Sequence, residues 1–136
     1  MENKPKLFTM RLQVGEDDLD QLVHVNNVVY LRWVQDVAEA HWLSLADDKT
    51  RNAMAWVVLR HEIDYKKPAL VNEQINLTTW VGETEGVRSV RYVRITDVEG
   101  NILATARTTW CMIDPSSQKP KRISEEIKSL FIIQSD

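Results

Sequence analysis

Three acids, a histidine and two asparagines stand directly ahead of a long segment that has helical spacing. They lie within the eleven residues 17–27 (DDLDQLVHVNN). One or two such side chains are enough to cap a helix, so this set is larger than capping requires. A carboxylate can act as a general base or as a nucleophile. The unpaired N–H groups at a helix start can stabilise an oxyanion. We therefore take this stretch as the candidate reaction centre.

The segment that must position these side chains reads as one long helix. It begins at about Asn27 and ends near the sequence ADDKTRN, which we expect to be a loop. Several alanines favour a helix here. The positions expected to form its apolar face recur every three or four residues, which is the spacing of one helix face. They are Leu31, Val34, Ala38, His41 and Leu45.

The rest of the chain reads mainly as strands. Residues 7–14 form one strand before the polar stretch, and residues 54–65, 73–83, 86–97 and 102–114 form four after the helix. Within residues 54–65 the alternation places Val57, Leu59, Ile63 and Tyr65 on one face. Gly100 supplies the turn between the last two strands. Residues 123–131 read as a short helix with Ser124 as its N-cap.

This order of elements predicts an α+β fold. Successive strands with short links favour an antiparallel sheet. The long helix must bury its apolar face, and the sheet is the only large apolar surface available to it. We therefore expect a curled antiparallel sheet of about five strands around one long central helix, in a single domain over residues 1–136.

The polar stretch resembles a signature of the hotdog-fold thioesterases, the branch related to 4-hydroxybenzoyl-CoA thioesterase and to the plant acyl-ACP thioesterases. The family pattern is roughly D-x-D-x-x-G-H-V-N-N-x-x-Y. The residues that match it are Asp18, Asp20, His24, Val25, Asn26, Asn27 and Tyr30. The resemblance extends from about Leu7 to Phe131. Two positions depart from it: Val23 replaces a glycine, and Leu22 replaces an asparagine of the plant enzymes.

The resemblance implies an acyl-CoA thioesterase, which cleaves acyl-CoA to the free acid and CoA. Asp20 would be the base or the nucleophile, and the amides around Asn26 and Asn27 would form the oxyanion hole. His24 would hold Asp20 or the attacking water in place. Two alternatives stay open: an acyl-ACP thioesterase, and a non-catalytic hotdog protein that binds acyl-CoA.

Each of these residues also has an ordinary structural interpretation. Asp20 could be a plain loop acid, His24 a structural hydrogen-bonding group, and Asn26 or Asn27 only a helix cap. Weaker candidates are each better explained by solvent exposure, loop position or burial. They are the acids Asp17, Asp18, Asp36, Glu39, Glu62 and Asp64, together with Tyr30, His41 and Cys111.

Local groups of cations are the expected contacts for the phosphates of CoA. The net charge of −3 and the pI of about 5.6 argue against nucleic acid as a partner. Charge-assisted hydrogen bonds from lysine or arginine would hold the phosphates. The candidate substrate-binding residues are Lys66, Lys67, Arg88 and Arg91, or the basic run of residues 119–122.

Other features limit the location and assembly of the protein. No apolar stretch approaches the roughly 18 residues of a membrane span, and the single Cys111 fits a reducing cytoplasm. Neither metal-ligand spacing nor a glycine-rich phosphate loop is present, so no cofactor is expected. A curled sheet with open edges favours a homodimer or homotetramer.

Overall fold

The computed structural model describes residues 4–20 and 25–133. The strands are β1 (Phe8–Gln13), β2 (Ala55–Tyr65), β3 (Gln74–Glu85), β4 (Arg88–Asp97) and β5 (Ile102–Ile113). The helices are the short 3₁₀ turn η1 (Glu16–Asp18), the long α1 (Asn27–Leu45), and the short α2 (Asp48–Ala53) and α3 (Glu125–Leu130).

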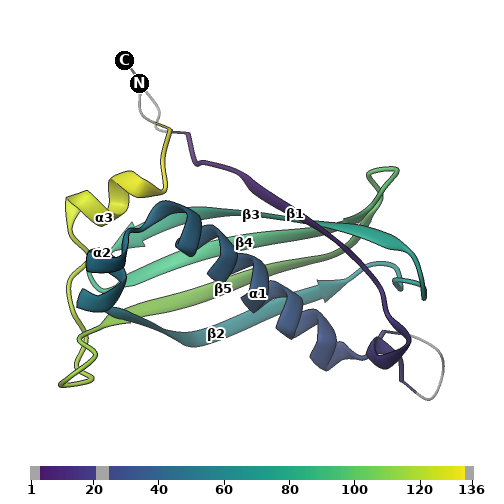
Figure 1. Cartoon of the computed structure of the whole chain (residues 1–136), viewed down its shortest axis with the longest axis horizontal. Helices are drawn as coiled ribbons and strands as arrows, with labels where there is room; N and C mark the ends of the chain where they lie inside the picture. The colour runs from purple at the N-terminus through teal and green to yellow at the C-terminus, as the bar shows by residue number, and fades with distance from the viewer. Residues whose placement is uncertain (1–3, 21–24, 134–136) are drawn as a thin grey trace.

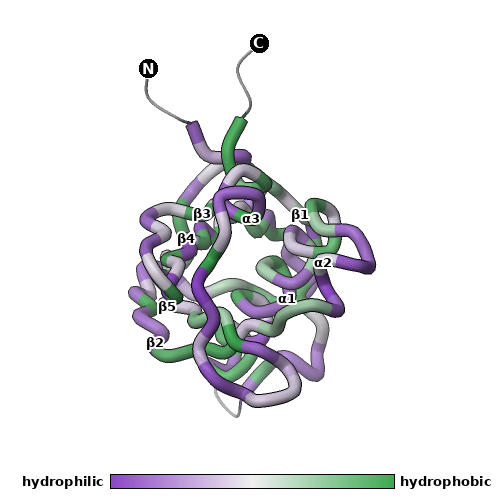
Figure 2. Tube along the Cα trace, turned by 90° about the vertical axis from the view of Figure 1, so that its left-hand side faces the viewer, coloured by the Kyte–Doolittle hydropathy of each residue, from purple (hydrophilic) through white to green (hydrophobic). Residues whose placement is uncertain are grey.

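The five strands form one antiparallel sheet in the order β1-β3-β4-β5-β2. Helix α1 crosses one face of this sheet. Helices α2 and α3 lie together near the C-terminal end of α1 (Figure 1). Seen from the end, β3, β4, β5 and β2 follow an arc around α1 (Figure 2). The predicted hotdog fold is therefore confirmed.

Helix α1 begins where the sequence predicts because Asn26 caps it. The side chain of Asn26 accepts a hydrogen bond of 3.0 Å from the amide of Val28. The buried face of the helix differs from the predicted stripe. Leu31 and Leu45 of that stripe are only half-buried, and other residues beside it are buried. Its buried residues are Val29, Tyr30, Trp33, Val34, Val37, Ala38 and His41. A curled sheet covers more of the helix circumference than a flat one, which explains the extra residues.

The main core fills the space between α1 and the sheet. Val34 and Val37 from the helix pack in the same cluster as Leu77 of β3 and Ile95 of β4, and all four are almost completely buried. Burying one such side chain contributes about 1.5–3 kcal/mol to stability. This packing fixes the position of α1 on the sheet and therefore the position of the polar loop that precedes it.

Two expectations from the sequence are wrong. The segment expected to be a loop contains α2, because the carboxylate of Asp47 caps it by accepting a hydrogen bond from the amide of Thr50. The predicted apolar face of β2 is also wrong. Its pairing with β5 shifts between Val58 and Arg60, and this bulge leaves Val57 and Leu59 exposed.

The turn at Gly100 and the cap of α3 agree with the sequence, and the two ends of the described chain pair with each other. Gly100 has a φ of +91°, and Ser124 caps α3 through the amide of Ile127. The amide of Lys6 donates to the carbonyl of Phe131, and the amide of Ile133 donates to the carbonyl of Lys4. We call this pairing of residues 4–6 with residues 131–133 the terminal clasp. None of the helices in the described ranges is long and apolar enough to cross a membrane.

Candidate active site

Two pockets lie along α1. The first is at the helix start, has a volume of about 430 Å³ and is called the helix-start pocket below. Its lining residues are Asp20, Val25, Asn27, Tyr30, Tyr65, Lys66, Lys67 and Pro68. The second has a volume of about 540 Å³, lies beside the C-terminal half of α1, and is called the aromatic pocket.

Backbone contacts hold the loop that carries Asp20 against the start of α1. Leu19 and Val25 form an isolated antiparallel bridge, and the amide of Asn26 donates to the carbonyl of Asp18 at 2.8 Å. Asp18 itself is used structurally, because its carboxylate accepts from the amide of Gly15 and pairs with Arg32. The loop is thus closed at its base and places the exposed Asp20 at the helix-start pocket. His24 lies outside the described residues.

Within the described residues, the amide of Asn27 in the first turn of α1 lacks a hydrogen-bond acceptor. The amide of Val28 is bonded to the Asn26 side chain, and the amide of Val29 to the Asn26 carbonyl. The amide of Asn26 is bonded to Asp18. Asn27 lines the same pocket as Asp20. The pocket therefore brings together one carboxylate and one helix-start donor.

Tyr30 forms a wall of the helix-start pocket. Its side chain is buried, packs edge-to-face on Tyr65, and its hydroxyl accepts a 3.1 Å hydrogen bond from the amide of Ala69. Burial raises the pKa of the Tyr30 hydroxyl. The packing role expected from the sequence is confirmed.

The structure separates the four predicted cations. The amides of Lys66 and Lys67 both donate to the carbonyl of Leu103, so their backbone is fixed while both exposed side chains stand at the helix-start pocket. Arg88 is exposed at the start of β4 and lines neither pocket. Arg91 is buried and lines the aromatic pocket, so it lacks the exposure expected of a contact to the CoA phosphates.

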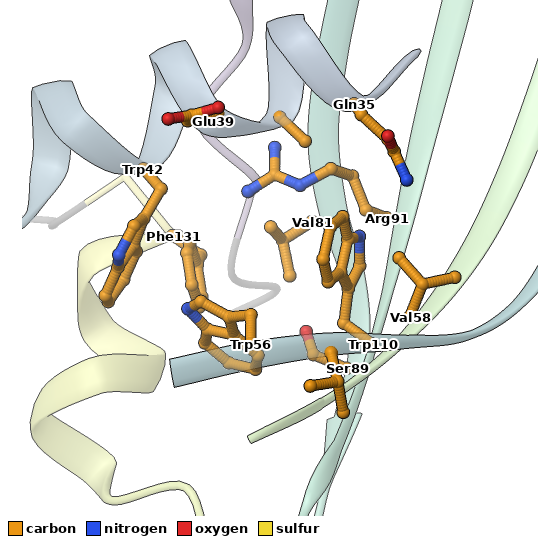
Figure 3. Close-up of a pocket in the computed structure, with 12 residues that line it drawn as sticks. Gln35, Glu39, Trp42, Trp56, Val58, Val81, Ser89, Arg91, Trp110 and Phe131 are labelled. Atoms are coloured by element: carbon orange, nitrogen blue, oxygen red, sulfur yellow. The ribbon is translucent and has the colours of Figure 1, made fainter. Parts of the chain in front are cut away.

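Aromatic side chains from distant parts of the chain build the aromatic pocket (Figure 3). Trp42 of α1 packs at 90° on Trp56 of β2, with ring centroids 5.7 Å apart. Phe131, in the terminal clasp, lies 5.8 Å from Trp42, and Trp110 of β5 completes the lining. No motif of the sequence predicts this pocket. The one available signal was the presence of five tryptophans in 136 residues.

Arg91 connects the sheet to α1 beneath the aromatic pocket. One guanidinium nitrogen, Nη1, lies 2.8 Å from Nδ1 of His41 and 3.1 Å from Oγ1 of Thr79. Burial and the charge of Arg91 lower the pKa of His41 to about 4, and burial lowers the pKa of Arg91 to about 10. At neutral pH His41 is therefore neutral and accepts the hydrogen bond, while Arg91 stays charged. The prediction that His41 is a satisfied core histidine is confirmed.

Two further polar contacts lie on β2. His61 of β2 connects the sheet to α1, because Nδ1 lies 2.9 Å from Thr108 Oγ1 and Nε2 lies 3.4 Å from Gln35 Nε2. Burial lowers the pKa of His61. Glu62 pairs with Arg60 at 2.7 Å on the strand surface. Cys111 is buried, as expected from the sequence. The described residues include no cluster of three or more His, Cys, Asp or Glu side chains that could hold a metal ion.

The comparisons with known proteins agree with this fold. A long helix held by a curled five-stranded antiparallel sheet is the fold of the hotdog thioesterases. The family description "Acyl-ACP thioesterase N-terminal domain" matches residues 5–131, and the chain belongs to this family. The long-chain acyl-CoA thioesterase FadM of Escherichia coli is 29% identical over 124 residues, which cover 87% of this chain and 92% of that protein.

Solved structures give the same result. The probable thioesterase YbaW from Escherichia coli has a TM-score of 0.77 and 28% identity, covering 90% of this chain and 94% of that one. A 1,4-dihydroxy-2-naphthoyl-CoA thioesterase from Synechocystis has a TM-score of 0.78, with 92% and 95% of the two chains covered. At 19% identity that second likeness bears on the fold alone. The family and the enzyme class predicted from the sequence are confirmed.

Proposed function

We propose that this thioesterase hydrolyses acyl-CoA at the helix-start pocket. The observation that carries the proposal is that Asp20 and Asn27, at the start of α1, line one pocket. Water attacks the thioester carbonyl as the carboxylate of Asp20 takes its proton. The amide of Asn27 stabilises the oxyanion, and the tetrahedral intermediate then expels the CoA thiolate, which is protonated as it leaves.

Asp20 can also act as the nucleophile. Its carboxylate then attacks the carbonyl, releases CoA and forms a mixed anhydride, which water cleaves. The two routes are distinguished by a single turnover in water labelled with ¹⁸O, followed by mass spectrometry of the peptide that contains Asp20. The nucleophile route places label in Asp20 when water attacks its side of the anhydride. The base route places label only in the acid product.

The aromatic pocket is the proposed site for the acyl chain. It is lined by apolar and aromatic side chains and lies beside α1 on the C-terminal side of the reaction centre. Burying an alkyl chain there contributes about 0.8 kcal/mol for each CH₂ group removed from water. This assignment also agrees with the name of the FadM relative, which describes long-chain acyl-CoA as its substrate.

CoA is the preferred carrier because Lys66 and Lys67 stand at the helix-start pocket. Two adjacent ammonium groups suit the phosphates of CoA. The matching family description instead names acyl-ACP, so hydrolysis of an acyl-carrier protein is the second candidate. The third is binding of acyl-CoA without turnover.

One hydrolysis screen distinguishes these candidates. Purified protein is assayed with short, long and aromatic acyl-CoAs, with acyl-ACP, and with N-acylcysteamine thioesters that lack the nucleotide. Higher kcat/KM for acyl-CoA than for the matched acyl-ACP supports the proposal. The opposite order assigns the carrier protein as the substrate. Calorimetric binding of acyl-CoA without release of free thiol would mean that the protein is a binder.

We further propose that the protein works as a homodimer or a homotetramer. Strand β2 lies at one edge of the sheet and presents the exposed side chains of Val57, Leu59 and Tyr65. An apolar edge of this kind is a hazard unless it is paired. Light scattering should give at least twice the chain mass of 15.8 kDa. Leu59→Glu should release monomers, whereas Leu43→Glu, at an exposed site on α1, should not. An active wild-type monomer contradicts this proposal. A cytoplasmic location stays a prediction.

A further inference from the structure

Arg91 is a buried cation without a buried anion. Its side chain is only 5% exposed, yet no carboxylate of the described residues lies within ion-pair distance of it. Its two partners, His41 and Thr79, are both uncharged. Burying a charge without a counter-charge is costly. Core packing alone would be served as well by an apolar side chain, so the charge at this position calls for another explanation.

The guanidinium faces the aromatic pocket. Arg91 is one of its lining residues, and Figure 3 shows its guanidinium beside α1, pointing toward the side where Trp42 and Phe131 lie. The indole N–H of Trp110, which lines the same pocket, is buried and lacks an acceptor among the described residues. The guanidinium of Arg91 is thus the charged donor that this largely apolar pocket offers to an oxygen-bearing group. A carboxylate accepts hydrogen bonds from a guanidinium and neutralises its charge.

The acid that shares this pocket does not serve as the counter-charge. Glu39 lies on the exposed side of α1 and forms no ion pair with Arg91. A negative charge at that position repels an incoming anion. Any preference of the pocket for a carboxylate must therefore come from Arg91.

We propose that the aromatic pocket selects acyl chains that end in a second carboxylate, so that the thioester is that of a long dicarboxylic acid. The terminal carboxylate pairs with the guanidinium of Arg91, and the methylene groups pack against the tryptophans. This inference rests on the proposed thioesterase function, because it assumes that the acyl chain runs from Asp20 along α1.

The separation of the two pockets sets the chain length. Helix α1 rises about 1.5 Å per residue, so Ala38 beside the aromatic pocket lies ~16 Å along the axis from Asn27. An extended chain advances ~1.2 Å per bond, so about 12 carbon atoms cover most of this distance and the ion pair spans the remainder. The matched substrates are therefore the CoA monothioester of dodecanedioic acid and dodecanoyl-CoA.

The deciding experiment compares these two thioesters in the wild type and in Arg91→Met. Wild-type kcat/KM should be about 10- to 100-fold higher for the dicarboxylic thioester, because the carboxylate makes charge-assisted hydrogen bonds. Arg91→Met should reverse this preference, and Arg91→Lys should retain part of it. Glu39→Gln should keep or strengthen it. Equal loss on both substrates in Arg91→Met would mean that Arg91 only supports the fold, and a wild-type preference for dodecanoyl-CoA would also overturn the proposal.

Two further measurements separate this inference from the proposed function and from misfolding. Calorimetry with free dodecanedioate and free dodecanoate needs no turnover, so Arg91-dependent binding of the diacid supports the inference even if no thioester is cleaved. If dodecanoate, and not dodecanedioate, inhibits hydrolysis in an Arg91-dependent way, Arg91 binds the carboxylate of a fatty acid product. The inference is then wrong. Thermal unfolding of Arg91→Met at or above the wild-type Tm shows that the variant folds, since an apolar residue of similar size is tolerated at such sites.

Discussion

The two pockets differ in what holds their polar groups in place. In the helix-start pocket, hydrogen bonds of the backbone position an exposed carboxylate and a helix amide within a few residues of each other. In the aromatic pocket, side-chain packing brings together α1, β2, β3, β4, β5 and residue 131. The first arrangement is local in sequence, and the second exists only in the folded chain. We therefore expect substitutions in the first pocket to change the rate of reaction, and substitutions in the second to change substrate choice or stability.

The largest effect should come from Asp20→Asn. Asparagine is nearly isosteric but cannot take a proton or attack a carbonyl, so kcat should fall by about 10²- to 10⁴-fold with the fold intact. The measurement is steady-state hydrolysis of the best acyl-CoA, with circular dichroism as the check on folding. Asp17→Asn, at an exposed neighbouring acid, is the control and should keep its activity. Activity of Asp20→Asn within a few-fold of wild type would remove Asp20 from the mechanism.

His41 should make the free energy of unfolding fall at acidic pH. Its pKa falls from an ordinary 6.5 to about 4 on folding, so the unfolded chain binds the extra proton between these values. The stability that depends on neutral His41 is fully present above pH 6.5 and is lost as the pH falls toward 4. The loss amounts to about 3 kcal/mol at most.

Urea unfolding of the wild type and His41→Gln at several values between pH 7 and pH 4.5 checks this. The difference in unfolding free energy between the two proteins should narrow as the pH falls. His61→Gln is the matched control, because His61 is only half-buried and should give a smaller change. Parallel pH profiles of wild type and His41→Gln would contradict the assignment.

Trp42→Leu should change chain-length preference without changing the chemistry. The variant loses part of the apolar wall, so kcat/KM for dodecanoyl-CoA should fall about tenfold while that for a short acyl-CoA changes little. Leu43→Ala removes apolar surface from the exposed side of the same helix turn and should leave both values unchanged. Equal falls for long and short chains would place the acyl chain elsewhere.

The smallest effect should come from neutralising the lysine pair. Lys66→Gln with Lys67→Gln should raise KM for acyl-CoA about three- to tenfold and weaken its dependence on ionic strength, because exposed phosphate contacts are screened by salt. Against an N-acylcysteamine thioester the double variant should match the wild type. Lys49→Gln, on α2, controls for the loss of positive charge. Equal losses on both substrates would show that the lysines support the fold.

The sequence predicted the fold well because the decisive signals are local. The helical spacing after Asn27, the cap at Ser124 and the turn at Gly100 each depend on residues close in the chain. The alternation in β2 failed because a bulge after Val58 reverses the face of the strand, and alternation alone does not reveal a bulge.

The site shows the same limit. The candidate Asp20 and the start of the helix both follow from one stretch of eleven residues, 17–27. The contact between Arg91 and His41 joins residues 50 positions apart in the sequence. Whether an arginine in a strand is exposed or buried depends on which face the sheet turns toward α1. The sequence alone therefore makes Arg91 a candidate phosphate contact, and only the fold shows that it is buried.

The terminal clasp gives the molecule a mechanically weak point. Its two strands pair antiparallel through Pro5 and Ile132, so a force that separates the two ends breaks their hydrogen bonds one after another, as in a zipper. Phe131 belongs both to this pairing and to the wall of the aromatic pocket. Fraying of the chain ends therefore opens the pocket before the sheet is disturbed. Tethering the protein by a tag at either end is expected to affect binding of long acyl chains more than the chemistry at Asp20.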